Sequence, residues 1–224
     1  MSKSKWAVCG VVVLSAGSTV AGAAVTFSDT EFAVADWGFE TIVSGPGGTS
    51  VPSQVTGGNP GFARQLVNTV NAGGGATIFG LSRYGTTNGT RYVPATDGAI
   101  ASVDWSIDSR WLSGLGGQGQ SITLGAKQGQ VVYYADYDIT GSSGAWTGHG
   151  ALSLVAGDFQ PRSAGAPIDF SATGAPLRFG FIVGNSGDGA YDNTVVYDNF
   201  SVTIRNIPGP GGVAMGAVGV GLLM

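Results

Sequence analysis

A period-two alternation of apolar and polar side chains constrains this chain more than any other feature. In segment 99–108, four apolar side chains at odd positions from 101 to 107 alternate with Ser and Asp at even positions. A half-buried β-strand has this period because successive side chains point to opposite faces of its sheet. The same alternation recurs at 122–124, 179–183 and 200–204. The pattern therefore predicts a chain built from antiparallel strands.

Clusters rich in Gly, Asn and Ser separate these strands, in a chain with 40 glycines among 224 residues. Glycine supplies the positive φ of tight turns. Segment 62–70 has a spacing that also suits a helix, but its β-branched residues Val67, Thr69 and Val70 favour a strand. A short helical turn is expected at 156–159. Further strands are expected at 25–27, 31–43, 76–82, 129–139 and 151–155.

About ten short strands with turns between them are typical of an all-β sandwich or barrel. The span from residue 24 to residue 206 is long enough for one jelly roll. We therefore predict a single jelly-roll-type β-sandwich over residues 24–206.

The first 23 residues have the composition of a secretory signal peptide. Lys3 and Lys5 precede an apolar stretch at 7–20, and small residues end at Ala23, after which we expect cleavage. The apolar run is shorter than the ~20 residues that span a bilayer. The single cysteine, Cys9, lies in this segment. The sequence thus predicts a cysteine-free exported bacterial protein, stabilised by its core or by a bound metal.

Charge and composition exclude several classes of partner and site. The chain has 10 basic and 14 acidic residues, a net charge of −4, and no basic run. A nucleic-acid partner held by phosphate contacts is therefore not expected. The absence of a Cys or His cluster excludes a zinc site of the usual kind, since such sites need several of these ligands.

The last residues form a Pro/Gly linker at 207–212, followed by an apolar run at 213–224. This order resembles the PEP-CTERM-type sorting signal of bacterial surface proteins, although Gly209 stands where that signal has an acidic residue and no basic residue follows. The resemblance implies sorting or processing machinery as a partner and a location at the cell surface. The alternative is a flexible apolar tail.

Segments along nearly the whole middle of the chain, taken in their order, resemble bacterial secreted β-sandwiches of the laminin-B-like and jelly-roll carbohydrate-binding type. The resemblance implies a sandwich at the cell surface without specifying a ligand, because such folds bind sugars, bind proteins or act as spacers. The segments are Phe32–Trp37, 57–61 with Arg64, 98–108, Trp146, 169–171, 178–183 with Asn185 and Ser186, and 197–203.

Asp198 has the same parity as Phe200 in the predicted strand through Ile204, which would place its carboxylate on the core side. A buried carboxylate must be paired, hydrogen-bonded or bound to a metal. The resemblance implies a structural Ca²⁺ that joins the first and last strands, with Asp29, Glu31, Glu40 and Asp198 as ligands, since Ca²⁺ prefers oxygen ligands. The alternative is that Asp198 accepts hydrogen bonds from backbone N–H groups in a turn.

Aromatic side chains could form a platform on which sugar rings stack. The candidates for ligand contact are Tyr133, Tyr137, Trp111 and Trp146, although aromatic residues in strands are more often part of the core. We therefore expect a non-catalytic exported module that contacts an extracellular polysaccharide or surface matrix. Two alternatives stay open: a purely structural surface protein, and a sandwich-fold carbohydrate hydrolase or lyase.

Catalytic residues are not predicted. His149 is the only histidine, and no Gly-x-Ser-x-Gly motif occurs. The only glutamates are Glu31 and Glu40, so the Glu-rich strand motif of sandwich glycosidases is absent.

Overall fold

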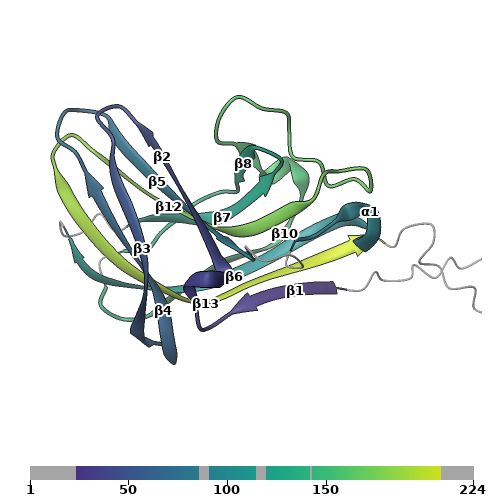
Figure 1. The fold of residues 1–224 in the computed structure, drawn as a ribbon, viewed down its shortest axis with the longest axis horizontal. Coiled ribbons are helices and arrows are strands. Elements are labelled where there is room, and N and C mark those ends of the chain that lie inside the picture. Colours follow the sequence, from purple (N-terminus) through teal and green to yellow (C-terminus); the bar gives the residue numbers. More distant parts are fainter. Residues whose placement is uncertain (1–23, 86–90, 115–119, 142, 208–224) are drawn as a thin grey trace, which may run out of the picture.

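The protein is described here by a computed structural model, which covers residues 24–85, 91–114, 120–141 and 143–207. The predicted signal peptide, the apolar tail and Cys9 lie outside these residues. Two antiparallel sheets face each other across one core (Figure 1), which confirms the predicted jelly-roll-type sandwich. Within the described residues, no helix is long and apolar enough to cross a membrane.

The first sheet, sheet I, is organised around the long strand β13. Its strands in spatial order are β10 (Thr147–Leu154), β6 (Ala99–Gly114), β13 (Tyr191–Ile207), β4 (Gly61–Val70) and β3 (Gly48–Gly58). The first strand of the described chain, β1 (Ala24–Asp29), pairs with the second half of β13 and lies beside it in Figure 1.

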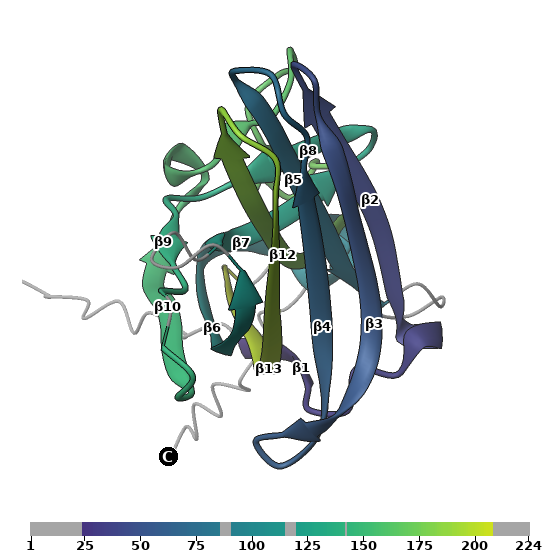
Figure 2. The same cartoon turned by 90° about the vertical axis from the view of Figure 1, so that its left-hand side faces the viewer.

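The second sheet, sheet II, is centred on β12. Its strands in spatial order are β11 (Gln160–Pro161), β8 (Val131–Tyr134), β7 (Ser121–Gln128), β12 (Leu177–Gly187), β5 (Ala76–Tyr84) and β2 (Trp37–Ser44). A two-residue strand, β9 (Asp138–Ile139), pairs with the start of β7. Figure 2 shows β3 and β2, edge strands of the two sheets, running along the same side of the sandwich.

Within the described residues, three short helices connect the strands. They are the 3₁₀ turn η1 (Val34–Asp36), the helix α1 (Pro94–Asp97) and the 3₁₀ turn η2 (Ala156–Asp158). The last of these confirms the helical turn expected at 156–159.

The core lies between the inward faces of the two sheets. Aromatic rings dominate its centre: Trp37 of β2 packs edge-on against Phe181 of β12 and Phe200 of β13, at centroid distances of 5.6 and 5.2 Å. Phe181 and Phe200 are both at most 1% exposed. Such tilted and edge-to-face pairs suit the ring quadrupoles, so these residues join sheet to sheet in the interior.

The strands predicted at 31–43 and 129–139 are each interrupted, and one further strand was not predicted. Segment 129–139 contains two separate strands, β8 and β9, with no strand at residues 135–137. The segment 31–43 does not form one strand, because Asp29 Oδ1 accepts hydrogen bonds from the backbone N–H groups of Glu31 and Phe32 at 2.8 and 2.9 Å and turns the chain. Strand β2 therefore begins only at Trp37. Strand β3 was not predicted, because its Gly-, Ser- and Pro-rich composition is typical of turns.

A β-bulge in β6 changes the predicted face of one residue. Arg205 pairs with Ser102 and Asn206 pairs with Ile100, so Ala101 has no partner in the ladder. A bulge reverses which side chains face inward on its two sides. As a result Ile100 is buried at 5% exposure while Ala101 is exposed. The prediction that Ala101 shares the apolar face of the strand is therefore wrong.

Candidate functional site

The outer face of sheet II carries an open pocket of about 400 Å³. Along β12, the side chains of Phe179, Phe181 and Val183 enter the core, so Ile182 and Gly184 face outward. We call this the aromatic pocket. Its lining residues come from β5, β7, β8, β9, β12, the start of β13 and the segments after β8 and β11: Phe79, Ser121, Thr123, Tyr134, Tyr137, Ile139, Arg162, Ile182, Gly184, Asn185, Ser186 and Tyr191.

The floor of the aromatic pocket is shaped by a glycine. A Cβ added at Gly184 would lie 2.5 Å from Cδ1 of Phe79 and 2.8 Å from Oγ of Ser121, which is closer than real contacts allow. Phe79 can therefore lie across β12 only because residue 184 has no side chain. The guanidinium of Arg162 covers the same ring, with its Cζ 3.6 Å from the ring centroid, in a cation–π contact.

The aromatic pocket combines flat rings with hydrogen-bonding groups. Tyr137 is 68% exposed, and Tyr134 and Tyr191 are half-buried at its edges. The Nε atom of Arg162 is buried and has no hydrogen-bond partner within the described residues. An apolar pocket with a few converging polar groups is the usual form of a small-ligand site.

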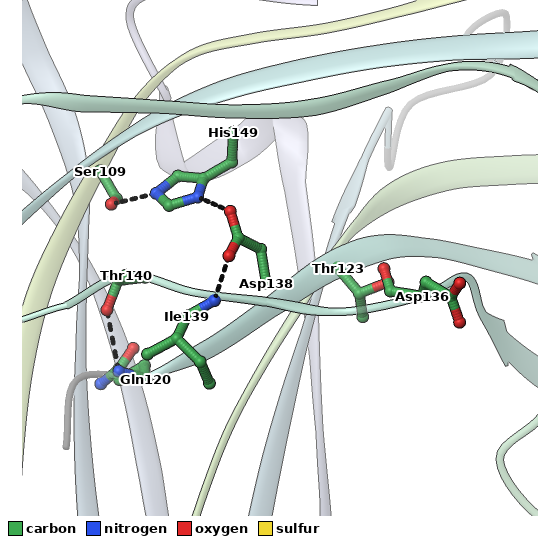
Figure 3. Close-up of polar contacts among 8 residues, drawn as sticks. All are labelled: Ser109, Gln120, Thr123, Asp136, Asp138, Ile139, Thr140 and His149. Atoms are coloured by element: carbon green, nitrogen blue, oxygen red, sulfur yellow. Dashed lines mark hydrogen bonds and ion pairs between the residues drawn. The ribbon is translucent and has the colours of Figure 1, made fainter.

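The segment that presents Tyr137 to this pocket is fastened to β7 (Figure 3). Thr123 Oγ1 donates to the carbonyl oxygens of Ala135 and Asp136 at 2.8 and 3.0 Å. The backbone N–H of Gln120 donates to Thr140 Oγ1 at 2.8 Å. Figure 3 also shows the carboxylate of Asp136 directed away from that of Asp138, so the two do not converge.

His149 of β10 connects this segment to sheet I. Its Nδ1 lies 2.8 Å from Asp138 Oδ2, and its Nε2 lies 2.7 Å from Ser109 Oγ of β6 (Figure 3). The hydrogen bond with His149, together with one from the backbone N–H of Ile139, holds the pKa of Asp138 below its usual value. The imidazole thus bridges the two sheets beside the aromatic pocket.

These three residues are connected like a hydrolytic Ser-His-Asp triad. Here, however, the serine is buried and the aspartate is exposed, which is the reverse of what a triad requires. Ser109 is 1% exposed, and the carboxylate end of the relay, Asp138, has a side chain that is 65% exposed. A nucleophile must reach its substrate while the acid orients the histidine from the interior. The arrangement therefore matches a structural bridge better than a reactive centre.

Of the four aromatic residues predicted to contact a ligand, the structure brings only Tyr137 to the aromatic pocket. Tyr133 is corrected: it is 3% exposed, belongs to the core and donates its hydroxyl to the carbonyl oxygen of Ala166. Its neighbour Tyr134 pairs with Gly125 and lines the pocket instead. A shift of one residue along a strand exchanges the two faces of the sheet.

Of the two tryptophans predicted to contact a ligand, Trp111 lies on β6 of sheet I and Trp146 directly precedes β10. Trp111 packs against the core, and Trp146 lies under the guanidinium of Arg110, with Cζ 4.8 Å from the ring centroid. Neither ring lines the aromatic pocket.

Asp198 is fully buried, but on the side of sheet I that faces away from the core. Asn199 has a φ of 52° and lies in a bulge between the pairs Asp198–Asp108 and Ser201–Ser106. The bulge reverses the alternation, so the predicted common face with Phe200 is corrected. Asp198 Oδ1 accepts from the N–H of Asn199 at 2.7 Å, and Oδ2 accepts from the N–H of Asn59. These are the turn contacts that the sequence left as the alternative to metal binding.

Burial raises the pKa of Asp198, and the nearby carboxylates of Asp108 and Glu31 act in the same direction. Of the other predicted metal ligands, Glu31 is thus near Asp198, whereas Asp29 and Glu40 are engaged elsewhere. Asp29 caps the turn after β1 and accepts from Trp37 Nε1 at 2.7 Å, while Glu40 lies on sheet II and pairs with Lys127.

The four predicted carboxylates therefore do not converge on one site. Across the described ranges, no group of three His, Cys, Asp or Glu side chains is placed to hold a metal ion. Ca²⁺ binding stays a prediction, and melting of the protein with and without a chelator would test it.

No protein-family profile and no curated protein sequence match this chain. Among solved structures, it is similar to the family 11 carbohydrate-binding module of a cellulosomal cellulase of Clostridium thermocellum. The TM-score is 0.48 at 11% identity, covering 84% of this chain and 99% of that one. It is also similar to the C-terminal family 22 carbohydrate-binding module of Clostridium thermocellum Xyn10B. There the TM-score is 0.46 at 10% identity, with 81% and 95% covered.

Proposed function

We propose that this protein is a non-catalytic exported module that binds a polysaccharide through the aromatic pocket on the outer face of sheet II. The observation that carries the proposal is the pocket itself. It places an exposed tyrosine ring beside a Phe79–Arg162 stack, with hydroxyl and guanidinium groups at the same opening.

Sugar rings have apolar C–H faces and polar hydroxyl edges. A flat aromatic ring covers the C–H face, and the Arg162 guanidinium and the hydroxyls of Ser121 and Tyr134, which line the same pocket, can hydrogen-bond to the hydroxyl edges. A purely structural surface protein has no need for a pocket that combines aromatic rings with hydrogen-bonding groups, which favours the binding function over that alternative.

The non-catalytic part of the proposal rests on the described carboxylates and on His149. Asp136 and Asp138 point apart, and the serine of the Ser109–His149–Asp138 bridge is buried. Glycoside hydrolysis needs two carboxyl groups facing one cleft. Export to the bacterial surface is proposed from residues 1–23 and from the Pro/Gly and apolar end of the sequence.

The test is a glycan array probed with the full chain, with and without Ca²⁺, followed by titration of the best polysaccharide. The variant Tyr137→Ala should weaken binding about tenfold or more, which corresponds to about 1.4 kcal/mol of binding free energy. Leu152→Ala is the matched control, because Leu152 is 79% exposed but lies on β10 of sheet I. Equal affinity of the two variants, or silence of the array across all polysaccharides, would contradict the proposal.

A further inference from the structure

A second pocket, of about 430 Å³, opens on sheet II and collects cationic side chains. Its lining includes Arg83 of β5, Arg178 of β12, Lys127 of β7 and Arg91 from the segment before α1. We call it the basic pocket. It holds four of the ten basic residues of a chain whose net charge is −4, so the positive charge is concentrated at one place.

Among the described residues, Glu40 is the carboxylate that pairs with two of these four cations. Glu40 Oε2 lies 2.7 Å from Lys127 Nζ and 3.9 Å from an Arg83 guanidinium nitrogen. Within the part of the chain that the structure describes, neither Arg91 nor Arg178 has a carboxylate at ion-pair distance, and Arg83 Nε is buried without a hydrogen-bond partner. The basic pocket therefore has an excess of positive charge and unused donors.

This arrangement costs the folded protein free energy. Arg178 and Lys127 are direct partners across the β12–β7 ladder, and like charges directly opposite each other destabilise a sheet. The side chains of Lys127 and Arg83 are only 16% and 22% exposed, so solvent screens their charges incompletely. An anion bound among them would offset this repulsion.

The basic pocket and the aromatic pocket lie on the same face of sheet II. Arg178 lines the basic pocket and Gly184 lines the aromatic pocket. The two residues are six positions apart on β12, and an even separation places both on one face of the sheet. The strand geometry puts them about 20 Å apart. Between them, Leu81 and Ile182 form an apolar cluster on the outer face of the sheet. An extended ligand lying along the strands can therefore contact both pockets.

We propose that the basic pocket binds the carboxylate or sulfate group of an acidic polysaccharide, and that sugars several residues farther along the same polymer occupy the aromatic pocket. This inference rests on the proposed function and narrows its ligand to polymers of uronic acids or sulfated sugars. Guanidinium groups have a planar set of N–H donors that matches both carboxylate and sulfate oxygens. Glu40 then balances part of the charge, which limits the affinity for anions.

The test measures the affinity of the full chain for polygalacturonate, for dextran sulfate and for unmodified dextran as the neutral control. Arg178→Gln should weaken binding of the preferred acidic polymer at least tenfold. Glu40→Gln removes the carboxylate that pairs with Lys127 and Arg83 and should tighten binding of that polymer severalfold. Arg205→Gln is the matched control, because Arg205 is an exposed arginine of β13 on sheet I. Melting temperatures of all variants verify that they fold.

The outcomes separate this inference from the proposed function. Binding of a neutral polysaccharide that depends on Tyr137 but not on Arg178 would overturn the acidic ligand and leave the proposed function in place. Equal loss in Arg178→Gln and Arg205→Gln would indicate attraction to overall charge and would also overturn the inference. Preference for polygalacturonate over dextran sulfate, or the reverse, identifies which anion the site takes. Failure to bind any polysaccharide would remove both proposals.

Discussion

His149 Nδ1 lies 2.8 Å from Asp138 Oδ2, and this contact joins β10 of sheet I to β9 at the edge of sheet II. Asp138 is the direct neighbour of Tyr137 and Ile139, which line the aromatic pocket. A buried imidazole on one sheet therefore holds the segment of the other sheet that lines the aromatic pocket.

Replacing this bridge should affect both stability and binding. His149→Leu removes both hydrogen bonds of the ring and leaves the buried hydroxyl of Ser109 without this partner. We expect a loss of about 1–3 kcal/mol in the free energy of unfolding, measured by urea denaturation, and weaker polysaccharide binding. Thr147→Val, at an exposed position of the same strand, should change neither quantity. Unchanged binding in a folded His149→Leu protein would show that the bridge does not position Tyr137.

Gly184 is expected to be essential to the shape of the aromatic pocket. In Gly184→Ala the new methyl group would overlap the ring of Phe79, so the ring and the Arg162 guanidinium above it must move. Overpacking of this kind costs about 1–3 kcal/mol, and affinity for the polysaccharide should fall. The control is Gly189→Ala, where an added Cβ would have no atom within 4 Å. Isothermal titration calorimetry of both variants measures the difference in affinity for the polysaccharide. Equal affinities would contradict the role assigned to Gly184.

Asp198 should stabilise the fold by accepting hydrogen bonds from the backbone N–H groups of Asn59 and Asn199. Asn has the same shape, but its NH₂ group cannot accept, so in Asp198→Asn the N–H of Asn59 or of Asn199 loses its partner. The expected loss is about 1–3 kcal/mol, measured by chemical denaturation. Asp108→Asn should lower the free energy of unfolding by less, because Asp108 accepts hydrogen bonds from side-chain amides, which can rotate. A fully stable Asp198→Asn protein would contradict this assignment.

The contribution of Asp104 should depend on pH. Hydrogen bonds from the backbone N–H of Ser153 and from Arg205 lower the pKa of this carboxyl below its ordinary value of 3.8. Because the pKa is lower in the folded state, the stabilisation is complete at pH values above the pKa of the unfolded state. It disappears as the pH falls through the pKa of the folded state.

The difference in unfolding free energy between the wild type and Asp104→Asn should therefore be constant from about pH 5 to 7 and shrink below about pH 4. Denaturation curves at a series of pH values measure it. Asp136→Asn, at an exposed position, is the control. A difference that grows on acidification would reverse the assigned sign.

Much of the fold could be predicted from local pattern. The alternation at 179–183 and 200–204 places Phe181 and Phe200 in the core, and both are buried there. Such segments are predictable because the period of a strand is a local property of the chain, and burial of one face follows from it.

The faces of several residues depended on contacts that no local pattern records. The bulges at Ala101 and Asn199 move Ile100 and Asp198 to faces that strict alternation does not predict. On β8, two adjacent tyrosines give no alternation of apolar and polar side chains. The register with β7 places Tyr133 inside and Tyr134 outside. A bulge or a register is set by pairing with another strand, so the affected segment alone carries no signal for it.

The two pockets depend on the tertiary structure to the greatest extent. Arg83, Lys127 and Arg178 stand far apart in the chain and meet because β5, β12 and β7 are neighbours in sheet II. Ser109 and His149, 40 residues apart, meet because β6 pairs with β10. Alternation along the chain was enough to specify strands and a sandwich, since it acts between adjacent residues. The partners of a charged or polar side chain follow from strand order, which forms only when the whole chain buries its core.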